Sequence, residues 1–228
     1  MATSNFIIAT TCMNRSNYLL KSLPSWLSLK VPIVIIDWSS KTPIKIDDPS
    51  VHVIRVDNKT TYDTSRSKNL SFRICQKLYP SIKYVLSIDC DVEIDELFEI
   101  NPKPNTVYRN DISFENEPNH KPDGKIHNPD YWGKYGTFLT SFECLNRVNG
   151  FDERLSGYAG IDIDLYERLA RIGVKTEFLK YDHLIHQTHD GRFDNYSIKS
   201  GPRSSRANNK IKWKKLWDHT FKQDDVVI

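Results

Sequence analysis

The sequence is poor in cysteine, and none of its cysteines forms a closely spaced pair. The four cysteines, at positions 12, 75, 90 and 144, are scattered through 228 residues. Zinc ribbons and disulfide frameworks need clustered or numerous cysteines. Both classes are therefore disfavoured, and a reducing compartment is expected.

Long hydrophobic runs and a large charge of one sign are also lacking. The first apolar run covers only residues 6–9, too short for a signal peptide or a membrane-spanning helix. The net charge is only +3, which does not indicate a nucleic-acid-binding protein. Apolar residues make up 39% and charged residues 27%, the balance of a folded globular chain. We expect a soluble, cytoplasmic protein with no nucleic-acid partner.

The first hundred residues alternate short apolar runs with helical patterns. Strands are expected at 6–10, 31–40, 51–57 and 84–94, and helices at 17–29, interrupted near Pro24, and at 64–79. This alternation predicts an α/β fold with a mostly parallel central sheet and helices on both faces. Such sheets bind ligands at the carboxyl ends of their strands.

The second half has a different character. Residues 101–135 are rich in Pro, Asn, Asp and His, which indicates loops and short antiparallel strands. A strand and short helix at 137–151, an amphipathic helix at 163–173 and a strand at 174–181 follow, and a basic helix at 210–221 ends the chain. We expect one domain over 1–228, with a nucleotide-binding half (1–100), an acceptor and catalytic half (101–190) and a mobile loop with the basic helix (191–228).

An acidic triplet, Asp89-Cys90-Asp91, ends the fourth expected strand. Residues two apart on a strand point to the same face, so the two carboxylates can converge. Converging carboxylates repel each other unless a cation lies beside them. The triplet is therefore a candidate metal or nucleotide site, although a solvated strand end gives the same pattern.

Two further acids open the helix expected at 163–173. Asp162 and Asp164 follow a glycine-aromatic turn, and Asp162 could present its carboxylate to a cleft as a general base. An ordinary helix N-terminus with two acids remains the alternative.

Three histidines, His183, His186 and His189, follow the last expected core strand. On a strand, His183 and His186 would face opposite ways, so the three do not bind one ion together. One histidine joined to carboxylates would suit manganese. Ordinary exposed histidines are the alternative.

A basic stretch follows the histidines, and its cations are spaced through 199–215. A segment of this kind could close over a diphosphate. The alternatives are a solvated face or a weak contact with a membrane surface through the helix at 210–221.

Together these motifs resemble those of the GT-A class of glycosyltransferases over roughly residues 6–190. In the first half, ATTCMNR (9–15), IVIIDWSS (33–40), SRSKN (65–69) and SIDCD (87–91) are similar to motifs of glycosyltransferase family 2. In the second half, VNGFDERLSGYAGIDIDLYERL (148–169) resembles the carboxyl part of β-1,4-galactosyltransferases and chondroitin polymerases. The resemblance implies a Rossmann-like GT-A fold with a small antiparallel part on the acceptor side.

The resemblance also implies a role for individual residues. The nucleotide pocket would be lined by Thr10, Asn14, Arg15, Asp37, Lys68 and Asn69, with Asp37 at the base. Asp89 would contact the ribose or the metal, Asp91 and His186 would bind Mn²⁺ or Mg²⁺, and Asp162 would be the catalytic base. His189 is the second choice as a metal ligand. The sequence departs from the family at Tyr158, Ile161 and Trp38-Ser39-Ser40.

The activity implied is inverting transfer of a sugar from a nucleoside diphosphate sugar, expected to be a UDP-sugar, to a hydroxyl of a glycan or glycoconjugate. A compact transferase of this type suits a bacterium or a large DNA virus. Three alternatives remain, namely a sugar nucleotidyltransferase, a non-catalytic sugar-nucleotide or carbohydrate-binding module, and a surface-interaction protein acting through its basic helix.

Overall fold

The structure is a computed structural model of the whole chain. It describes residues 5–95, 100–110, 136–155, 160–179 and 183–187. His189 and the basic segment with the helix expected at 210–221 lie outside these residues. In the described part of the chain, no helix has both the length and the apolarity that crossing a membrane requires.

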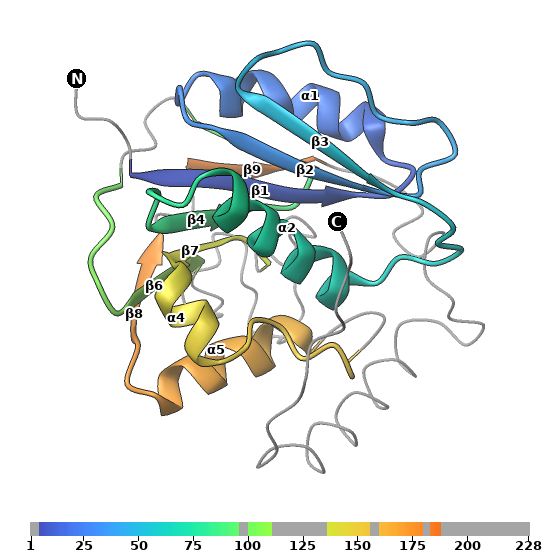
Figure 1. Cartoon of the computed structure of the whole chain (residues 1–228). Coiled ribbons are helices and arrows are strands. Elements are labelled where there is room, and N and C mark those ends of the chain that lie inside the picture. Colours follow the sequence, from blue (N-terminus) through green and yellow to red (C-terminus); the bar gives the residue numbers. More distant parts are fainter. Residues whose placement is uncertain (1–4, 96–99, 111–135, 156–159, 180–182, 188–228) are drawn as a thin grey trace, which may run out of the picture.

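A seven-stranded sheet forms the centre of the molecule, with the strand order β3-β2-β1-β4-β7-β6-β8 (Figure 1). Strands β1 to β4 are parallel, β7 is antiparallel to both β4 and β6, and β8 is parallel to β6. The strands are β1 (Phe6–Cys12), β2 (Ile33–Trp38), β3 (Val51–Val56), β4 (Tyr84–Ser87), β6 (Thr106–Asn110), β7 (Phe138–Ser141) and β8 (Lys175–Leu179). The expected α/β fold with a mainly parallel sheet is confirmed.

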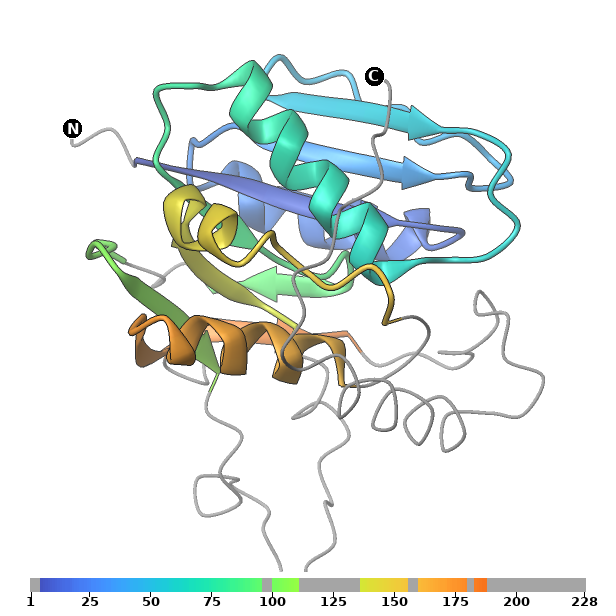
Figure 2. The same ribbon diagram turned by 60° about the horizontal axis from the view of Figure 1, so that its bottom comes forward.

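Helices cover both faces of this sheet because its strands are apolar on both sides. On one face α1 (Ser16–Leu27) buries Leu23 and Trp26 in the same apolar cluster as Ile8 of β1. The opposite face is covered by α2 (Thr64–Leu78), α4 (Phe142–Arg147) and α5 (Ile161–Arg171) (Figure 2). Contrary to expectation, α1 continues through Pro24 to Leu27. A proline there removes one hydrogen bond near the end of the helix, where few turns remain to be disrupted.

The strand expected over 84–94 is broken, and this prediction was wrong. β4 ends at Ser87, the chain turns through residues 88–91, and β5 (Val92–Ile94) leaves the main sheet. β5 then pairs antiparallel with β9 (Leu184–His186) in a separate two-stranded sheet. The acidic triplet therefore lies in a turn rather than along one face of a strand.

Two glycines fix the ends of α5. Gly160 precedes its first residue with φ of 90°, and Gly173 follows its last turn with φ of 80°, values that favour glycine. The helix begins two residues earlier than expected, at Ile161, so Asp162 and Asp164 both lie in its first turn. α5 therefore directs its acidic end toward the edge of the sheet where the triplet turns.

Candidate functional site

The candidate site lies where parallel strands β1, β2 and β4 end. Arg15 follows β1, and the acidic triplet follows β4 directly. β7 runs the opposite way, so its first residues and Gly136 lie at the same edge. This is the edge at which doubly wound sheets bind ligands.

Asp91, in the turn after β4, contacts a residue that follows β1 and a residue of β9. Its Oδ2 accepts a hydrogen bond of 2.7 Å from Arg15 Nη1, and His186 Nε2 lies 3.8 Å from the same oxygen. The side chains of Asp91 and His186 are only 6% and 5% exposed. The sequence analysis paired Asp91 with His186, and the structure brings them together.

Gln187 explains why His186 lies beside the triplet. Its backbone N–H donates to Asp91 O at 2.8 Å, and its side-chain amide donates to Tyr18 O and Ser22 Oγ on α1. The β5–β9 pairing places His186 opposite Val92. Gln187, which the sequence analysis did not assign, thus joins β9 to both α1 and the triplet.

Asp89 faces a different cation from Asp91. Its Oδ1 lies 2.9 Å from the ammonium of Lys68, which also donates to Gly136 O at 3.2 Å. A Cβ on Gly136 would lie 2.7 Å from Asp89 Oδ2, so only glycine leaves room for this arrangement. Lys68 itself is 3% exposed and lies 5.6 Å from the Phe151 ring centroid. Lys68 is therefore a buried counter-ion of the triplet.

Asp162, the predicted base, lies at the start of α5 close to these charges. Burial raises the pKa of its carboxyl, the positive charge of Lys68 lowers that pKa, and the negative charge of Asp89 raises it, with a net shift upward. Within the part of the chain that the structure describes, its buried Oδ1 has no hydrogen-bond partner. An acid with a raised pKa and an unused acceptor atom is suited to proton transfer.

The donor atoms suit a divalent cation, although the described residues hold no group of three His, Cys, Asp or Glu side chains placed for one. Carboxylate and imidazole are both ligands that manganese accepts. Asp91 Oδ2 and His186 Nε2 are close enough to share an ion after small shifts. Asp89 and Asp91 are each paired with a different cation of the chain, Lys68 and Arg15.

Asp37 and Asn69 are placed differently from the expectation that they line the nucleotide pocket. The Asp37 carboxylate accepts hydrogen bonds from the backbone N–H groups of Ser40 and Ile44 and from Arg55. Burial alone would raise the pKa of Asp37, but these bonds outweigh it and hold the pKa below its usual value. Asp37 is 0% exposed, so it fixes the loop after β2 instead of presenting a surface to a ligand.

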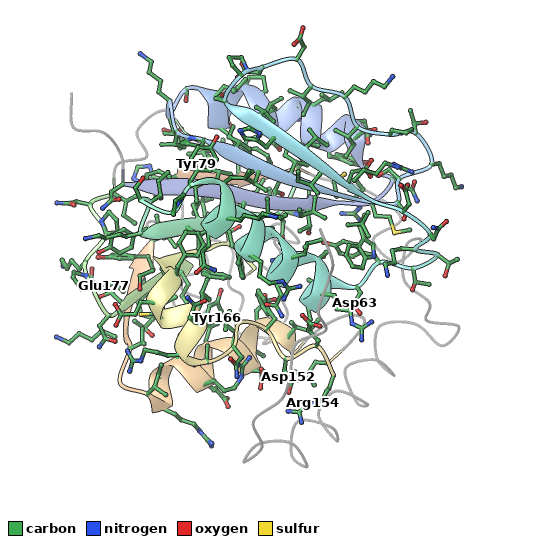
Figure 3. The ribbon with its side chains drawn as sticks, viewed as in Figure 1. Asp63, Tyr79, Asp152, Arg154, Tyr166 and Glu177 are labelled. Carbon is green, nitrogen blue, oxygen red and sulfur yellow. The ribbon has the colours of Figure 1, made fainter. Side chains whose placement is uncertain are left out.

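Asn69 joins α2 to the segment after α4. Its side-chain amide donates to Phe151 O and Glu153 Oε1, and its oxygen accepts from Phe151 N. In the same segment Asp152 pairs with Arg154 at 2.8 Å (Figure 3). The segment NGFDER (149–154) is therefore fixed against α2, the helix that also carries Lys68.

Thr10 lies in the second half of β1, and Asn14 lies in the loop that follows this strand. Thr10 is 2% exposed, whereas Asn14 has φ of 58° and bridges the loops after β1 and β2. Asn14 N donates to Ser40 Oγ, and its Oδ1 accepts from Lys41 N. Two further residues at this edge, Thr11 and Tyr62, share a hydrogen bond between their hydroxyls that no sequence pattern indicated.

The fold of the chain matches that of solved glycosyltransferase structures. A sequence profile for the N-terminal domain of galactosyltransferase matches residues 118–190, less than half of the chain. No curated protein sequence matches the chain. The chain has the GT-A fold, because solved GT-A glycosyltransferases match it over nearly its whole length.

Three solved structures illustrate the similarity. Drosophila β1,4-galactosyltransferase 7 with xylobiose has a TM-score of 0.62 at 15% identity, covering 97% of this chain and 84% of that one. The mannosyltransferase PcManGT of Pyrobaculum calidifontis, with GDP-Man and Mn²⁺, has a TM-score of 0.57 at 11% identity, covering 95% and 65%. GalNAc-T7, with UDP, GalNAc and Mn²⁺, has a TM-score of 0.62 at 13% identity, covering 93% and 49%.

Proposed function

We propose that the chain is an inverting, metal-dependent glycosyltransferase. It transfers a sugar from a nucleoside diphosphate sugar, a UDP-sugar being the expected donor, to a hydroxyl of a glycan or glycoconjugate. The observation that carries the proposal is the contact between Asp91 Oδ2 and His186 Nε2, 3.8 Å apart where β4 ends. Lys68, which pairs with Asp89 at 2.9 Å, also lowers the pKa of Asp162, the proposed base.

On the donor side, Asp91 and His186 would hold the divalent cation, and Arg15 lies beside them. The bound cation would offset the negative charge that develops on the departing nucleoside diphosphate. Arg15 carries a second positive charge at the same place. Cations of the basic segment at 199–206 would add to this charge. Structures of the same fold contain Mn²⁺ together with UDP or GDP-Man.

On the acceptor side, Asp162 would take the proton of the attacking hydroxyl. The hydroxyl oxygen forms its bond to the anomeric carbon while the bond to the diphosphate oxygen breaks, which inverts the configuration. Lys68 favours the ionised, proton-accepting form of Asp162, since its positive charge lowers that pKa. Asp89, held by Lys68, would face the ribose or the cation.

The proposal is tested by a donor screen with purified protein. Thermal unfolding is measured with UDP-, GDP- and CDP-sugars, each with and without Mn²⁺, and slow donor hydrolysis is followed in the same mixtures. We expect one nucleotide to stabilise the protein only with metal and its sugar nucleotide to be hydrolysed. Metal-dependent stabilisation without any hydrolysis or transfer would instead indicate a non-catalytic binding module.

A parallel reaction distinguishes the nucleotidyltransferase alternative. The protein is incubated with a panel of sugar 1-phosphates and nucleoside triphosphates, and pyrophosphate is measured. No pyrophosphate is expected, because the leaving group of the proposed reaction is a nucleoside diphosphate. Pyrophosphate release that depends on both substrates would overturn the proposal.

A further inference from the structure

A row of residues crosses the sheet beside the proposed site. Ser87 is in register with Phe138, Phe138 with Arg109, and Arg109 with Phe178. Ser87 ends β4, and Arg109 and Phe178 are the penultimate residues of β6 and β8. The row therefore lies at the same end of the sheet as the acidic triplet. It extends from β4 to β8, away from β1, β2 and β3.

At the outer end of this row, an arginine contacts two aromatic rings. The Arg109 guanidinium carbon lies 4.8 Å from the centroid of Tyr166 and 5.3 Å from that of Phe178. Tyr166 in turn meets Phe138 edge-to-face at 5.9 Å and is 5% exposed (Figure 3). These contacts anchor Arg109 to the core and fix the ring of Phe178 from one side.

Phe178 nevertheless remains exposed. Its side chain is 54% exposed, the largest value among the exposed large hydrophobic residues in the described part of the chain. A single exposed hydrophobic residue is ordinary. Here, however, one side of the ring is backed by a cation that is itself held in place, so the ring is oriented before any ligand arrives.

Helix α5 carries both the proposed base, Asp162, and Tyr166, the other ring that Arg109 contacts. Asp162 and Tyr166 are four residues apart on α5, so their Cβ atoms are about 5–6 Å apart on one face. Tyr166 and Arg109 thus link the start of α5, where Asp162 lies, to Phe178 near the end of β8. Three strand spacings of about 4.8 Å separate Phe178 from Ser87, which lies next to the triplet, and this is more than the span of one sugar ring.

We propose that Phe178, backed by Arg109, is a stacking platform for a sugar ring of the acceptor beyond the ring that reacts. The proposal rests on the proposed function, and it specifies that the acceptor has at least two sugar units. The apolar C–H face of a pyranose suits the negative face of an aromatic ring. An aromatic ring already held in orientation loses little conformational freedom on binding.

The test measures binding of the protein, with Mn²⁺ and UDP or GDP, to immobilised glycans of one to four units. Wild type is compared with Phe178→Ala and Phe178→Trp. We expect Phe178→Ala to weaken binding to glycans of two or more units by about threefold to tenfold, with monosaccharides unchanged. Phe178→Trp should retain the preference for longer glycans. Leu20→Ala is the matched control, since Leu20 is a 51% exposed hydrophobic residue on α1.

Each outcome is decisive. Equal binding of wild type and Phe178→Ala to every longer glycan overturns the inference, and so does a wild type that does not prefer longer glycans or binds none. Metal-dependent stabilisation by nucleotide is measured on all variants in parallel. Its absence from wild type counts against the proposed function, whereas its presence with no effect at Phe178 counts against the platform alone.

Discussion

Arg15 is paired with the oxygen of Asp91 that, in the proposed enzyme, would bind the metal ion. Its Nη1 lies 2.7 Å from Asp91 Oδ2, the same oxygen that lies 3.8 Å from His186 Nε2. A guanidinium and a metal ion that bind the same oxygen weaken each other's interaction with it. In the proposed enzyme, Arg15 therefore competes with the metal for Asp91 until the donor's diphosphate offers it another partner.

This competition predicts opposite effects of Arg15→Gln on two affinities. Without nucleotide, Mn²⁺ should bind more tightly by about threefold to tenfold, because an ion pair worth about 1 kcal/mol no longer opposes it. Nucleoside diphosphate should bind more weakly, since a cation near the phosphates is lost. Both affinities are measured by titration calorimetry.

Lys21→Gln is the control for the change of charge. Lys21 is 67% exposed and lies 3.4 Å from Glu93, so the substitution removes one positive charge from α1 without touching Asp91. It should leave both affinities unchanged. Weaker Mn²⁺ binding by Arg15→Gln would show that Arg15 assists the metal and does not compete with it.

Asp162→Asn should separate catalysis from folding. We expect sugar transfer to fall by a factor on the order of 10²–10⁴, with donor affinity nearly intact. Thermal stability should stay equal or rise. Burial raises the pKa of Asp162, so at a pH above that value the folded state carries the cost of an ionised buried group.

Asp164→Ala provides the contrasting case on the same helix. Asp164 Oδ2 accepts two hydrogen bonds from Arg168, whose guanidinium also binds Val148 O and Gly150 O. Removing Asp164 leaves Arg168 without this partner, so the melting temperature should fall while transfer by the folded fraction persists. Retained transfer in Asp162→Asn would remove Asp162 from the mechanism.

The pH profile of transfer should carry the signature of a perturbed carboxyl. Only the ionised form of Asp162 accepts a proton, so kcat/KM falls as the pH drops through its raised pKa. The acid limb therefore lies at a higher pH than an aspartate with its ordinary pKa would give. In Lys68→Met the limb should move to still higher pH, because the positive charge that lowers this pKa is gone. An acid limb that is unmoved in Lys68→Met would contradict the coupling between the two residues.

The sequence predicted the sheet well where burial alone determines it. Apolar runs such as 6–10 and 31–40 became the fully buried strands β1 and β2. The pattern failed at Ser87, because Ile88, Val92 and Ile94 continue the apolar run on both sides of the acids and nothing local marks the departure of β5. The partner of β5 is β9, some ninety residues later, and such pairing depends on tertiary contacts.

The candidate site shows a similar division. Asp91 and His186 were predicted together, and they lie 3.8 Å apart. Asp37 and Asn69 were assigned to the pocket from their motifs, yet both side chains are taken up by hydrogen bonds within the fold. A motif locates a residue at a strand or helix end, but the direction of its side chain depends on neighbours that are distant in sequence.

Gly136→Ala tests whether the Lys68–Asp89 pair matters for transfer. The added Cβ would lie 2.7 Å from Asp89 Oδ2 and 3.2 Å from Lys68 Nζ, so both side-chain ends must move. Because they are the ends of side chains and not backbone, the cost to stability should be small. Displacing charged groups beside the reacting atoms should reduce transfer by about 10- to 100-fold.

Gly173→Ala is the matched control. It should lower stability and leave transfer unchanged, the reverse of Gly136→Ala. Nothing lies within 4 Å of the added Cβ, but φ is +80°, so the substitution strains the backbone after α5. The free energy of unfolding should fall by about 1–2 kcal/mol, with transfer unchanged. Thermal melts and initial rates of both variants check the pair. Normal transfer by Gly136→Ala would contradict this prediction. It would show that the reaction does not depend on the position of Asp89 beside Lys68.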